Sequence, residues 1–222
     1  MFTKPTGPRI GLGPVVAAFR AHSSHSASLT TETESRTHPA RAPELSLRIV
    51  AESDVLVGER IVLRAGRPED LARLIEIRRE PDVLRRWGEF DSEEISRDFI
   101  GTTGGFVVEC DGEVIGAIQF YEESEPMYRH AGMDLFLTTA RHGLGLGTEA
   151  VRILARHLLF ERDHHRLTID PAADNGAAIR SYEKVGFRRV GVMRQYERGP
   201  DGVWHDGLLM DLLREDFKDA PG

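Results

Sequence analysis

Glycine occupies every second position in the stretch Arg141–Thr148, which reads Arg-His-Gly-Leu-Gly-Leu-Gly-Thr. The stretch follows a short apolar run at 133–137 and precedes a helical pattern that runs from Glu149 to about Arg162. A turn from a strand into a helix exposes backbone N–H groups at the helix N-terminus, where the helix dipole favours an anion. The stretch therefore predicts a phosphate-binding turn, and the alternative is a turn that is merely rich in glycine.

The glycine spacing excludes two common phosphate-binding loops. A P-loop needs a lysine directly after its last glycine, and the residue after Gly147 is Thr148. A dinucleotide-binding fingerprint needs a third glycine three positions after the second, whereas Gly143, Gly145 and Gly147 alternate. The turn fits a pyrophosphate clasp of another kind.

Composition limits the class of protein. A chain of 222 residues with 40% hydrophobic content can bury one sizeable core and still have room for a tail. A formal net charge of -7 disfavours a nucleic-acid binder, and the acidic runs at 89–94 and 122–125 suit either a cationic partner or a solvated surface. The single cysteine, Cys110, excludes an intrachain disulfide, and no apolar run approaches the length of a membrane span. We expect a cytoplasmic monomer or homodimer with no nucleic-acid or membrane partner.

Residues 1–54 differ from the rest of the chain. They are rich in proline, and Ser, Thr and His dominate from His22 to His38. Such a segment buries too little apolar surface to offset its ordering entropy, so we expect a disordered extension. The apolar run Ile10–Phe19 allows a signal peptide as an alternative, although Pro14 interrupts it, and a transit peptide is a second alternative. We expect a single domain at 55–217 and a short tail at 218–222.

Within that domain, the periodicity predicts a mixed α/β sheet with helices on both sides. Asp111-Gly112 is a strong hairpin signal between two strands. Asp174 or Asn175 is suited to cap a helix that Gly186 closes. The expected strands are at 59–65, 106–110, 114–120, 131–137, 166–170, 187–193 and 207–213, and the expected helices are near 67–80, 83–87, 93–100, 148–162 and 177–185.

Three segments together resemble the GNAT superfamily of N-acetyltransferases, and most of all its aminoglycoside 6'-N-acetyltransferases. They are residues 133–148, the run Ile-Asp-Pro-Ala-Ala-Asp-Asn at 169–175, and the run Ala-Ala-Ile-Arg-Ser-Tyr-Glu-Lys-Val-Gly-Phe at 177–187. The resemblance covers about Leu56 to Phe217. It implies the GNAT acyl-CoA N-acyltransferase fold, whose central mixed sheet splays at the cofactor site, with acetyl-CoA as the acyl donor and no metal.

The resemblance also implies which residues hold the donor. The backbone of Leu135, Phe136 and Leu137 would pair with the pantetheine arm, while Asn175, Ala178 and Tyr182 would lie along it. The pyrophosphate would rest on the amides of the glycine turn, formed by His142, Gly143, Leu144, Gly145, Leu146, Gly147 and Thr148. The family loop begins with Arg or Gln, but alignment on Gly145 and Gly147 places His142 there and Arg141 one step early, so either side chain can be the phosphate contact.

Acetyl transfer needs an acceptor for the amine's proton, and Asp134 and Asp170 are the candidates. Both interrupt apolar strands at the ends that face the presumed gap. By the resemblance, Asp134 is the base; Asp170 has the alternative role of forming a turn before Pro171. Tyr182 is the candidate acid for the departing thiolate, and otherwise a core tyrosine. A backbone N–H in 133–137 would stabilise the oxyanion.

Trp87 follows the first helices, where this superfamily builds its acceptor pocket, and the acids Glu89, Asp91, Glu93 and Glu94 come after it. With Asp134 and Asp170 they would form an aromatic floor and acidic walls for a cationic substrate; the alternative is a core tryptophan beside an acidic helix start. The run Asp163-His164-His165 looks like a metal motif but has no further ligand cluster nearby in the sequence.

We expect an N-acetyltransferase that acts on a small cationic amine, foremost an aminoglycoside. A protein N-terminus, a polyamine or another amine is the alternative acceptor. The alternative of another class is a non-catalytic sensor of acetyl-CoA or aminoglycoside.

Overall fold

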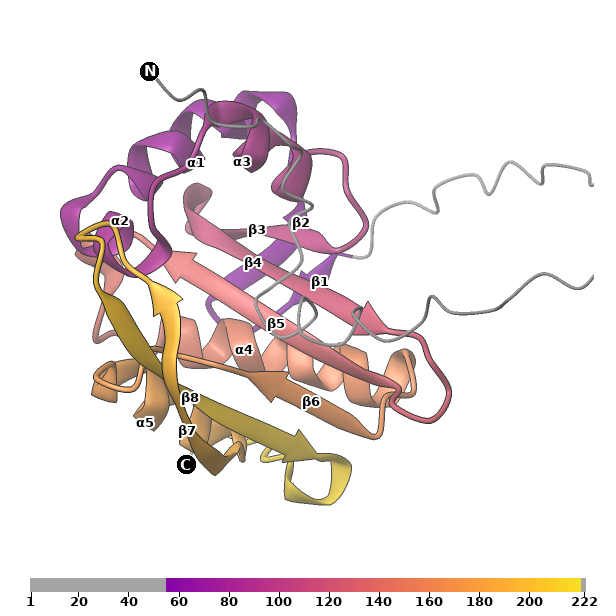
Figure 1. The fold of residues 1–222 in the computed structure, drawn as a ribbon. Helices are drawn as coiled ribbons and strands as arrows, with labels where there is room; N and C mark the ends of the chain where they lie inside the picture. The colour runs from indigo at the N-terminus through magenta and orange to yellow at the C-terminus, as the bar shows by residue number, and fades with distance from the viewer. Residues whose placement is uncertain (1–54, 221–222) are drawn as a thin grey trace, which may run out of the picture.

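One mixed sheet of eight strands organises the computed structural model, which describes residues 55–220. The expected extension at 1–54 lies outside the described residues. The strands lie in the order β1-β2-β3-β4-β5-β6-β8-β7, and every neighbouring pair is antiparallel except β5 and β6 (Figure 1). Their bounds are β1 Leu56–Val57, β2 Ile61–Ala65, β3 Gly105–Cys110, β4 Glu113–Glu123, β5 His130–Leu137, β6 Arg166–Ile169, β7 Arg188–Arg198 and β8 Trp204–Leu213. The expected mixed α/β class is confirmed.

Helices cover both faces of this sheet. One face carries α1 Leu71–Arg78, α2 Pro81–Trp87 and α3 Ser92–Phe99, and the other carries α4 Leu146–Arg156 and α5 Gly176–Val185 (Figure 1). A wider π-type turn, His157–Glu161, continues α4, and short 3-10 turns lie at Pro68–Asp70, Thr139–Arg141 and Arg214–Asp216. None of the helices in residues 55–220 combines the length and apolarity that a bilayer span requires.

The sheet divides the hydrophobic core into two clusters. Met133 and Leu137 of β5 pack in the larger cluster with α4 and α5, whereas Phe136 packs with α1 and α3 in the smaller one. Successive side chains of a strand point to opposite faces. Asp134 therefore shares the face of Phe136, on the side of the first three helices.

Several local predictions are confirmed because local chemistry determines them. Asp111 and Gly112 both have positive φ, of 53° and 78°, as a two-residue hairpin turn requires. The Asn175 side chain caps α5 by accepting a hydrogen bond from the Ala178 N–H at 3.2 Å, and Gly186 ends the helix with a φ of 116°.

Two sets of boundaries differ from the prediction. Helix α4 begins at Leu146, two residues before the expected start, because Gly145 takes the left-handed conformation and turns the chain directly into the helix. Strands β7 and β8 extend to Arg198 and Trp204, well past the expected ends. Their outer residues are largely exposed and polar, so no apolar alternation marks them in the sequence.

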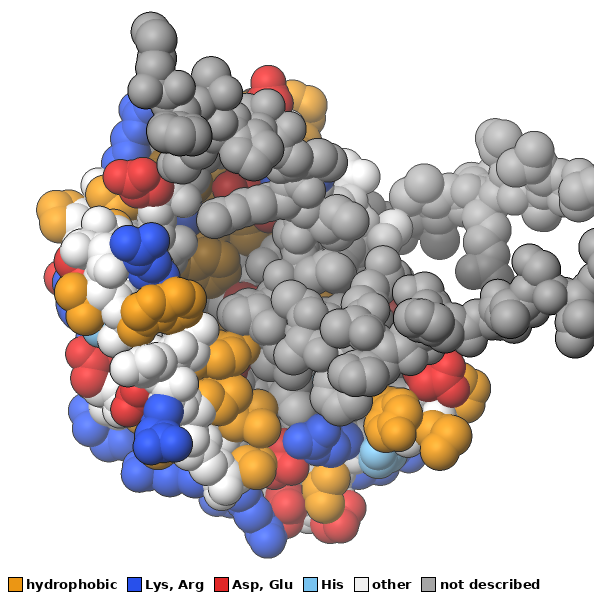
Figure 2. Space-filling view, viewed as in Figure 1, with side chains coloured by type: hydrophobic (Ala, Val, Ile, Leu, Met, Phe, Trp, Pro, Cys, Tyr) orange, Lys and Arg blue, Asp and Glu red, His pale blue; other side chains and the backbone are white. Residues whose placement is uncertain are grey.

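Charges of both signs are spread over the described part of the face in Figure 2. Acidic and basic side chains are interspersed there, so that face does not present a field of one sign. The grouped carboxylates described below lie instead around pockets.

Candidate active site

A gap opens between β5 and β6 in the middle of the sheet. The two strands pair only at Ala131 with Leu167 and at Gly132 with Thr168. Beyond Gly132, the edge of β5 that faces β6 has no ladder partner among residues 55–220. An extended ligand with amide groups can add to such an edge as a strand would. The backbone of residues 135–137, which we expected to pair with the cofactor, lies along this open edge.

A cleft of about 390 Å³ runs from this gap over the glycine turn. Tyr182 and the α5 residues Asn175 and Ala178 lie on one of its walls. All but one of the residues expected to hold the cofactor line it, and they are Leu135, Phe136, Leu137, His142, Gly143, Gly145, Leu146, Gly147, Thr148, Asn175, Ala178 and Tyr182. The exception, Leu144, has an exposed side chain and does not line the cleft.

The glycine turn has the geometry of an anion site. Gly143 and Gly145 have φ angles of 75° and 81°, which a residue with a side chain adopts only at a cost. The first backbone hydrogen bond of α4 runs from the Glu149 N–H to the Gly145 carbonyl at 3.0 Å, so the N–H groups of residues 146–148 remain available as donors. The turn is built to meet a phosphate with backbone amides.

Arg60 and Glu149 hold this turn against the start of β2. The Glu149 carboxylate accepts hydrogen bonds from the backbone N–H of Arg60 at 2.8 Å and from its guanidinium at 2.9 Å. The same guanidinium donates to the Leu144 carbonyl at 2.8 Å. Sequence reasoning missed this arrangement because its partners lie 84 to 89 residues apart.

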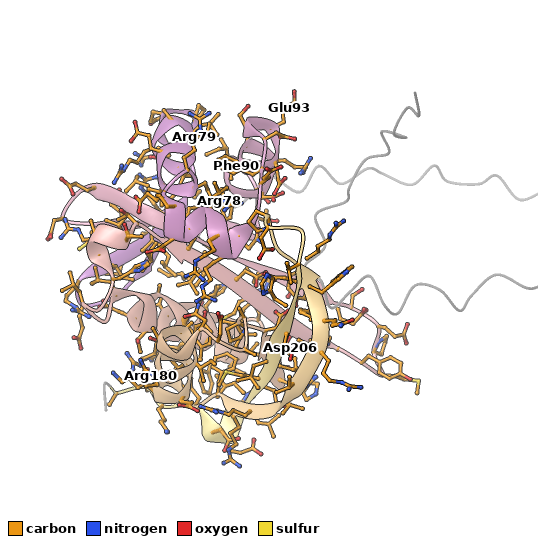
Figure 3. The ribbon with its side chains drawn as sticks, turned by 60° about the vertical axis from the view of Figure 1, so that its left-hand side comes forward. Arg78, Arg79, Phe90, Glu93, Arg180 and Asp206 are labelled. Carbon is orange, nitrogen blue, oxygen red and sulfur yellow. The ribbon has the colours of Figure 1, made fainter. Side chains whose placement is uncertain are left out.

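Both candidates for the first position of the family loop already have polar partners within the protein. The Arg141 guanidinium pairs with Glu113 at 3.1 Å, and the His142 Nε2 lies 3.0 Å from the Leu137 carbonyl oxygen. Arg180 and Lys184 of α5 also line the cleft, and Figure 3 shows Arg180 on that helix. Their spacing of four residues places them on one helix face, a signal that sequence analysis did not use.

Asp134 and Asp170 lie beyond the point where β5 and β6 diverge, and both line a second pocket, of about 300 Å³. Burial, together with the nearby Asp170, raises the pKa of Asp134 to about 7, although a hydrogen bond with Gln119 opposes the shift. Burial also raises the pKa of Asp170, which accepts a hydrogen bond from the Tyr196 hydroxyl at 2.6 Å. Asp134 is therefore a buried carboxyl with a pKa raised to about 7, and Asp170 is held in place by Tyr196.

Tyr182 is buried and lines both the cofactor cleft and the second pocket. Burial and the neighbouring Asp134 and Asp170 raise its pKa above the ordinary value of 10.0. The hydroxyl therefore stays protonated over the whole range in which proteins normally work, and it can donate a hydrogen bond at the junction of the two cavities.

Trp87 separates the two cavities and also lines both. Its ring meets Phe136 edge-on, with centroids 5.1 Å apart, and the Arg78 guanidinium lies 5.1 Å from the Trp87 centroid and 5.6 Å from that of Phe136. Arg78 is only 1% exposed, and burial lowers its pKa to about 10. Figure 3 shows Arg78 and Phe90 close together, consistent with the 4.7 Å between guanidinium and ring. Both expected roles of Trp87, core residue and pocket lining, are thus combined.

The acidic wall of the second pocket differs in part from the predicted one. Glu89 does not line it; the acids that do, besides Asp134 and Asp170, are Glu94, Asp98 and Glu197. Glu94 and Asp98 project from α3 at helical spacing, and Glu197 comes from the far end of β7. Nothing local in the sequence links β7 to α3, so Glu197 was out of reach of sequence reasoning.

The histidine run near the end of α4 has a structural role. His164 is 1% exposed, and its Nε2 lies 2.6 Å from a carboxylate oxygen of Glu122. Within residues 55–220, no group of three or more His, Cys, Asp or Glu side chains is arranged to hold a metal ion.

The splayed mixed sheet, with a glycine turn at the mouth of its gap, defines the class of acyl-CoA N-acyltransferases. The acetyltransferase (GNAT) domain model matches residues 60–188, more than half of the chain. The chain therefore belongs to the GNAT family of acetyl-CoA-dependent N-acetyltransferases.

Characterised relatives are distant. The chain is 29% identical over 164 residues to an aminoglycoside N(6')-acetyltransferase type 1 of Klebsiella pneumoniae, which covers 64% of this chain and 79% of the relative. It is 29% identical over 112 residues to a probable N-acetyltransferase, YjcK, of Bacillus subtilis, which covers 50% of this chain and 61% of the relative.

Solved structures repeat the fold. Aminoglycoside acetyltransferase AAC(6')-Ib in complex with coenzyme A aligns with a TM-score of 0.58 at 27% identity, over 70% of this chain and 96% of that one. RimJ of Mycobacterium smegmatis in complex with CoA-disulfide aligns with a TM-score of 0.63 at 23% identity, over 73% of this chain and 88% of that one. The second likeness, at its low identity, concerns the fold alone.

Proposed function

We propose that the chain transfers the acetyl group of acetyl-CoA to a primary amine of a small polycationic acceptor, and that the acceptor is an aminoglycoside modified at its 6'-amino group. The observation that carries the proposal is the lining of the 300 Å³ pocket, which we call the acceptor pocket. Its acids are Glu94, Asp98, Asp134, Asp170 and Glu197. Its one arginine, Arg86, pairs with Asp174. The pocket therefore selects for positive charge.

The distant relatives support the choice of acceptor. Aminoglycoside N(6')-acetyltransferases align over most of their own length, and the AAC(6')-Ib fold has been solved with both coenzyme A and kanamycin. In this chain the acid-lined pocket adjoins the cofactor cleft, as an acceptor pocket must. An aminoglycoside carries several amines and thus suits several carboxylates.

Before the amine can attack, one proton must be removed from the acceptor's ammonium group. With a lysine-like pKa near 10.4, only about one amine in 2,500 is neutral at pH 7, at a cost of about 4.6 kcal/mol. Asp134 takes this proton, because its raised pKa brings it close to the working pH and it lies beside the gap. Asp170, fixed by Tyr196, pairs with the ammonium before transfer and contributes to orientation.

The remaining steps belong to β5 and Tyr182. Acetyl-CoA supplies the thioester, whose carbonyl carbon the neutral amine attacks. A backbone N–H of residues 133–137 stabilises the developing oxyanion, an interaction typically worth about 3 to 4 kcal/mol. The C–S bond then breaks, and the Tyr182 hydroxyl donates to the departing thiolate. The nitrogen gives up its second proton at this stage. The ammonium thus loses two protons, one to solvent through Asp134 and one that ends on the thiol of coenzyme A.

Replacement of Tyr182 by phenylalanine should lower kcat about a hundredfold, because the thiolate loses its donor. The KM for acetyl-CoA should change little, since the ring and its packing against Phe187 remain. Steady-state release of thiol measures both constants. Unchanged kcat, with an unchanged thermal midpoint, would assign Tyr182 to the core alone.

An acceptor comparison tests the proposal. Purified protein is given acetyl-CoA with kanamycin, spermidine, a short peptide with a free N-terminus, or no acceptor, and thiol release is followed. We expect the highest kcat/KM with kanamycin, and the site of acetylation is read by mass spectrometry. Preference for the peptide or for spermidine would favour the alternative acceptors. Binding of coenzyme A by calorimetry without turnover of any amine would favour the non-catalytic sensor.

A further inference from the structure

A larger cavity, of about 810 Å³, lies next to the acceptor pocket, and we call it the hairpin cavity. It lies between the end of α2, the segment 172–174 that precedes α5, and the far end of the β7–β8 hairpin. Figure 1 shows that hairpin end beside α2. Arg86, Ala172 and Glu197 line both cavities, so the two are neighbours with a common wall. The two cavities therefore lie side by side, with these three residues between them.

The hairpin end is fixed relative to the reaction centre. The register of β7 and β8 shifts between Met193 and Glu197, and Gln195 there has a φ of 51°. The Gln195 N–H donates to Asp206 at 2.8 Å, and the next residue, Tyr196, donates to Asp170 at 2.6 Å. Such a bulge re-aims side chains next to it. The hairpin cavity thus keeps a defined position relative to Asp170.

Trp204 gives this cavity an aromatic wall. It begins strand β8, and its side chain is 55% exposed, which is unusual for so large an apolar ring. A ring of this kind binds the apolar face of a sugar or a cation above its plane. Glu197, half-buried at the common wall, adds a carboxylate within the same space. A cavity that has both an aromatic ring and a carboxylate in its lining suits a ring that bears an amine.

Volume limits what the acceptor pocket can hold by itself. Its 300 Å³ is at the small end of ligand sites, which span about 300 to 1,000 Å³. One amine-bearing ring fills a space of this size, and a ligand of several rings must extend beyond it. The hairpin cavity is the neighbouring space that shares its wall.

We propose that the hairpin cavity is a second acceptor subsite, which binds a further amine-bearing ring of an elongated amino sugar while its first ring presents an amine to Asp134. The inference rests on the proposed function and deepens it by assigning acceptor length to Trp204 and Glu197. Contacts with a remote ring that persist through the reaction lower KM without changing kcat.

Two acceptors that share the reacting group test the subsite. Kanamycin has several rings, whereas 6-amino-6-deoxyglucose presents the same kind of primary amine on one ring. Trp204→Ala should raise the KM for kanamycin about tenfold, the loss expected for a cation–π contact of about 1.4 kcal/mol. The KM for the single-ring amine, the KM for acetyl-CoA and kcat should stay as in the wild type. Val203→Ala, at an equally exposed neighbour that does not line the cavity, is the matched control.

The outcomes separate the subsite from the proposed function. If Trp204→Ala changed the KM for both acceptors equally, or for neither, the subsite would be overturned. Turnover of kanamycin by the wild type would still support the proposed function. If wild-type protein acetylates neither acceptor, the proposed function fails, and calorimetry with kanamycin then decides about the subsite. A heat of kanamycin binding that is present in the wild type and absent in Trp204→Ala would support the subsite. The absence of any binding heat with the wild type would overturn the subsite.

Discussion

Replacement of Asp134 by asparagine is expected to lower kcat/KM for amine acetylation at pH 7 by about a hundredfold to ten-thousandfold, the usual contribution of a positioned base. The amide has nearly the shape of the carboxylate, and it keeps the hydrogen-bonding position next to Gln119. The loss should therefore come from proton transfer and charge rather than from packing. Thiol release with kanamycin at saturating acetyl-CoA measures it.

The pH dependence makes the prediction specific. A base works only when deprotonated, and the pKa of Asp134 is raised to about 7. In the wild type, kcat/KM should therefore rise with pH through about 7 and then level off. In Asp134→Asn the reactive species is free neutral amine, so kcat/KM should keep rising about tenfold per pH unit toward the amine's own pKa.

Asp98→Asn is the matched control, because Asp98 is an acid of the same pocket placed on α3 rather than at the gap. We expect it to raise KM by a few-fold and to keep the pH profile of the wild type. If Asp134→Asn retained the profile as well, Asp170→Asn would be the next variant, since Asp170 is the other carboxyl at the gap. A profile that survives both changes would exclude both carboxyls at the gap as the base.

Gly132→Ala is expected to lower the free energy of unfolding by about 1 to 3 kcal/mol, the usual cost of overpacking. A Cβ at this position would lie 2.0 Å from Cζ of Tyr121, whose ring covers the last paired residue before β5 and β6 diverge. Relief requires the ring or the strand to move. Because the gap begins here, affinity for coenzyme A should fall as well.

Chemical denaturation and calorimetry with coenzyme A measure these two effects. Gly191→Ala is the control, since a Cβ there meets nothing within 4 Å and its strand, β7, is at the edge of the sheet. The double variant Tyr121→Ala/Gly132→Ala should be closer to Tyr121→Ala than additivity predicts, because the clash is gone. A Gly132→Ala protein as stable as the wild type would mean that the apex of the gap tolerates a wider strand separation.

Sequence reasoning succeeded where neighbours along the chain determine the structure. The Asp111-Gly112 turn and the Asn175 cap each act over a few residues, so their residue types were sufficient. The placement of Asp134 at the gap followed from its break in an apolar strand. Its role as the base stays a prediction.

The remainder depends on contacts between distant segments. Glu197 lines the acceptor pocket together with acids of α3, and it lies at a register shift of β7 that no periodicity of the sequence marks. Arg60 reaches the glycine turn across 84 residues of sequence. Glu89, the predicted acid, lies near Trp87 in sequence but lines none of the pockets described above. Proximity along the chain was a poor guide there.

The split core has an evolutionary consequence. Helices α1–α3, which supply Trp87 and Glu94 to the acceptor pocket, pack through their own cluster, whereas the helices at the glycine turn pack through the other. Mutations can therefore accumulate in the first three helices and remodel amine selectivity while the donor-binding half drifts little.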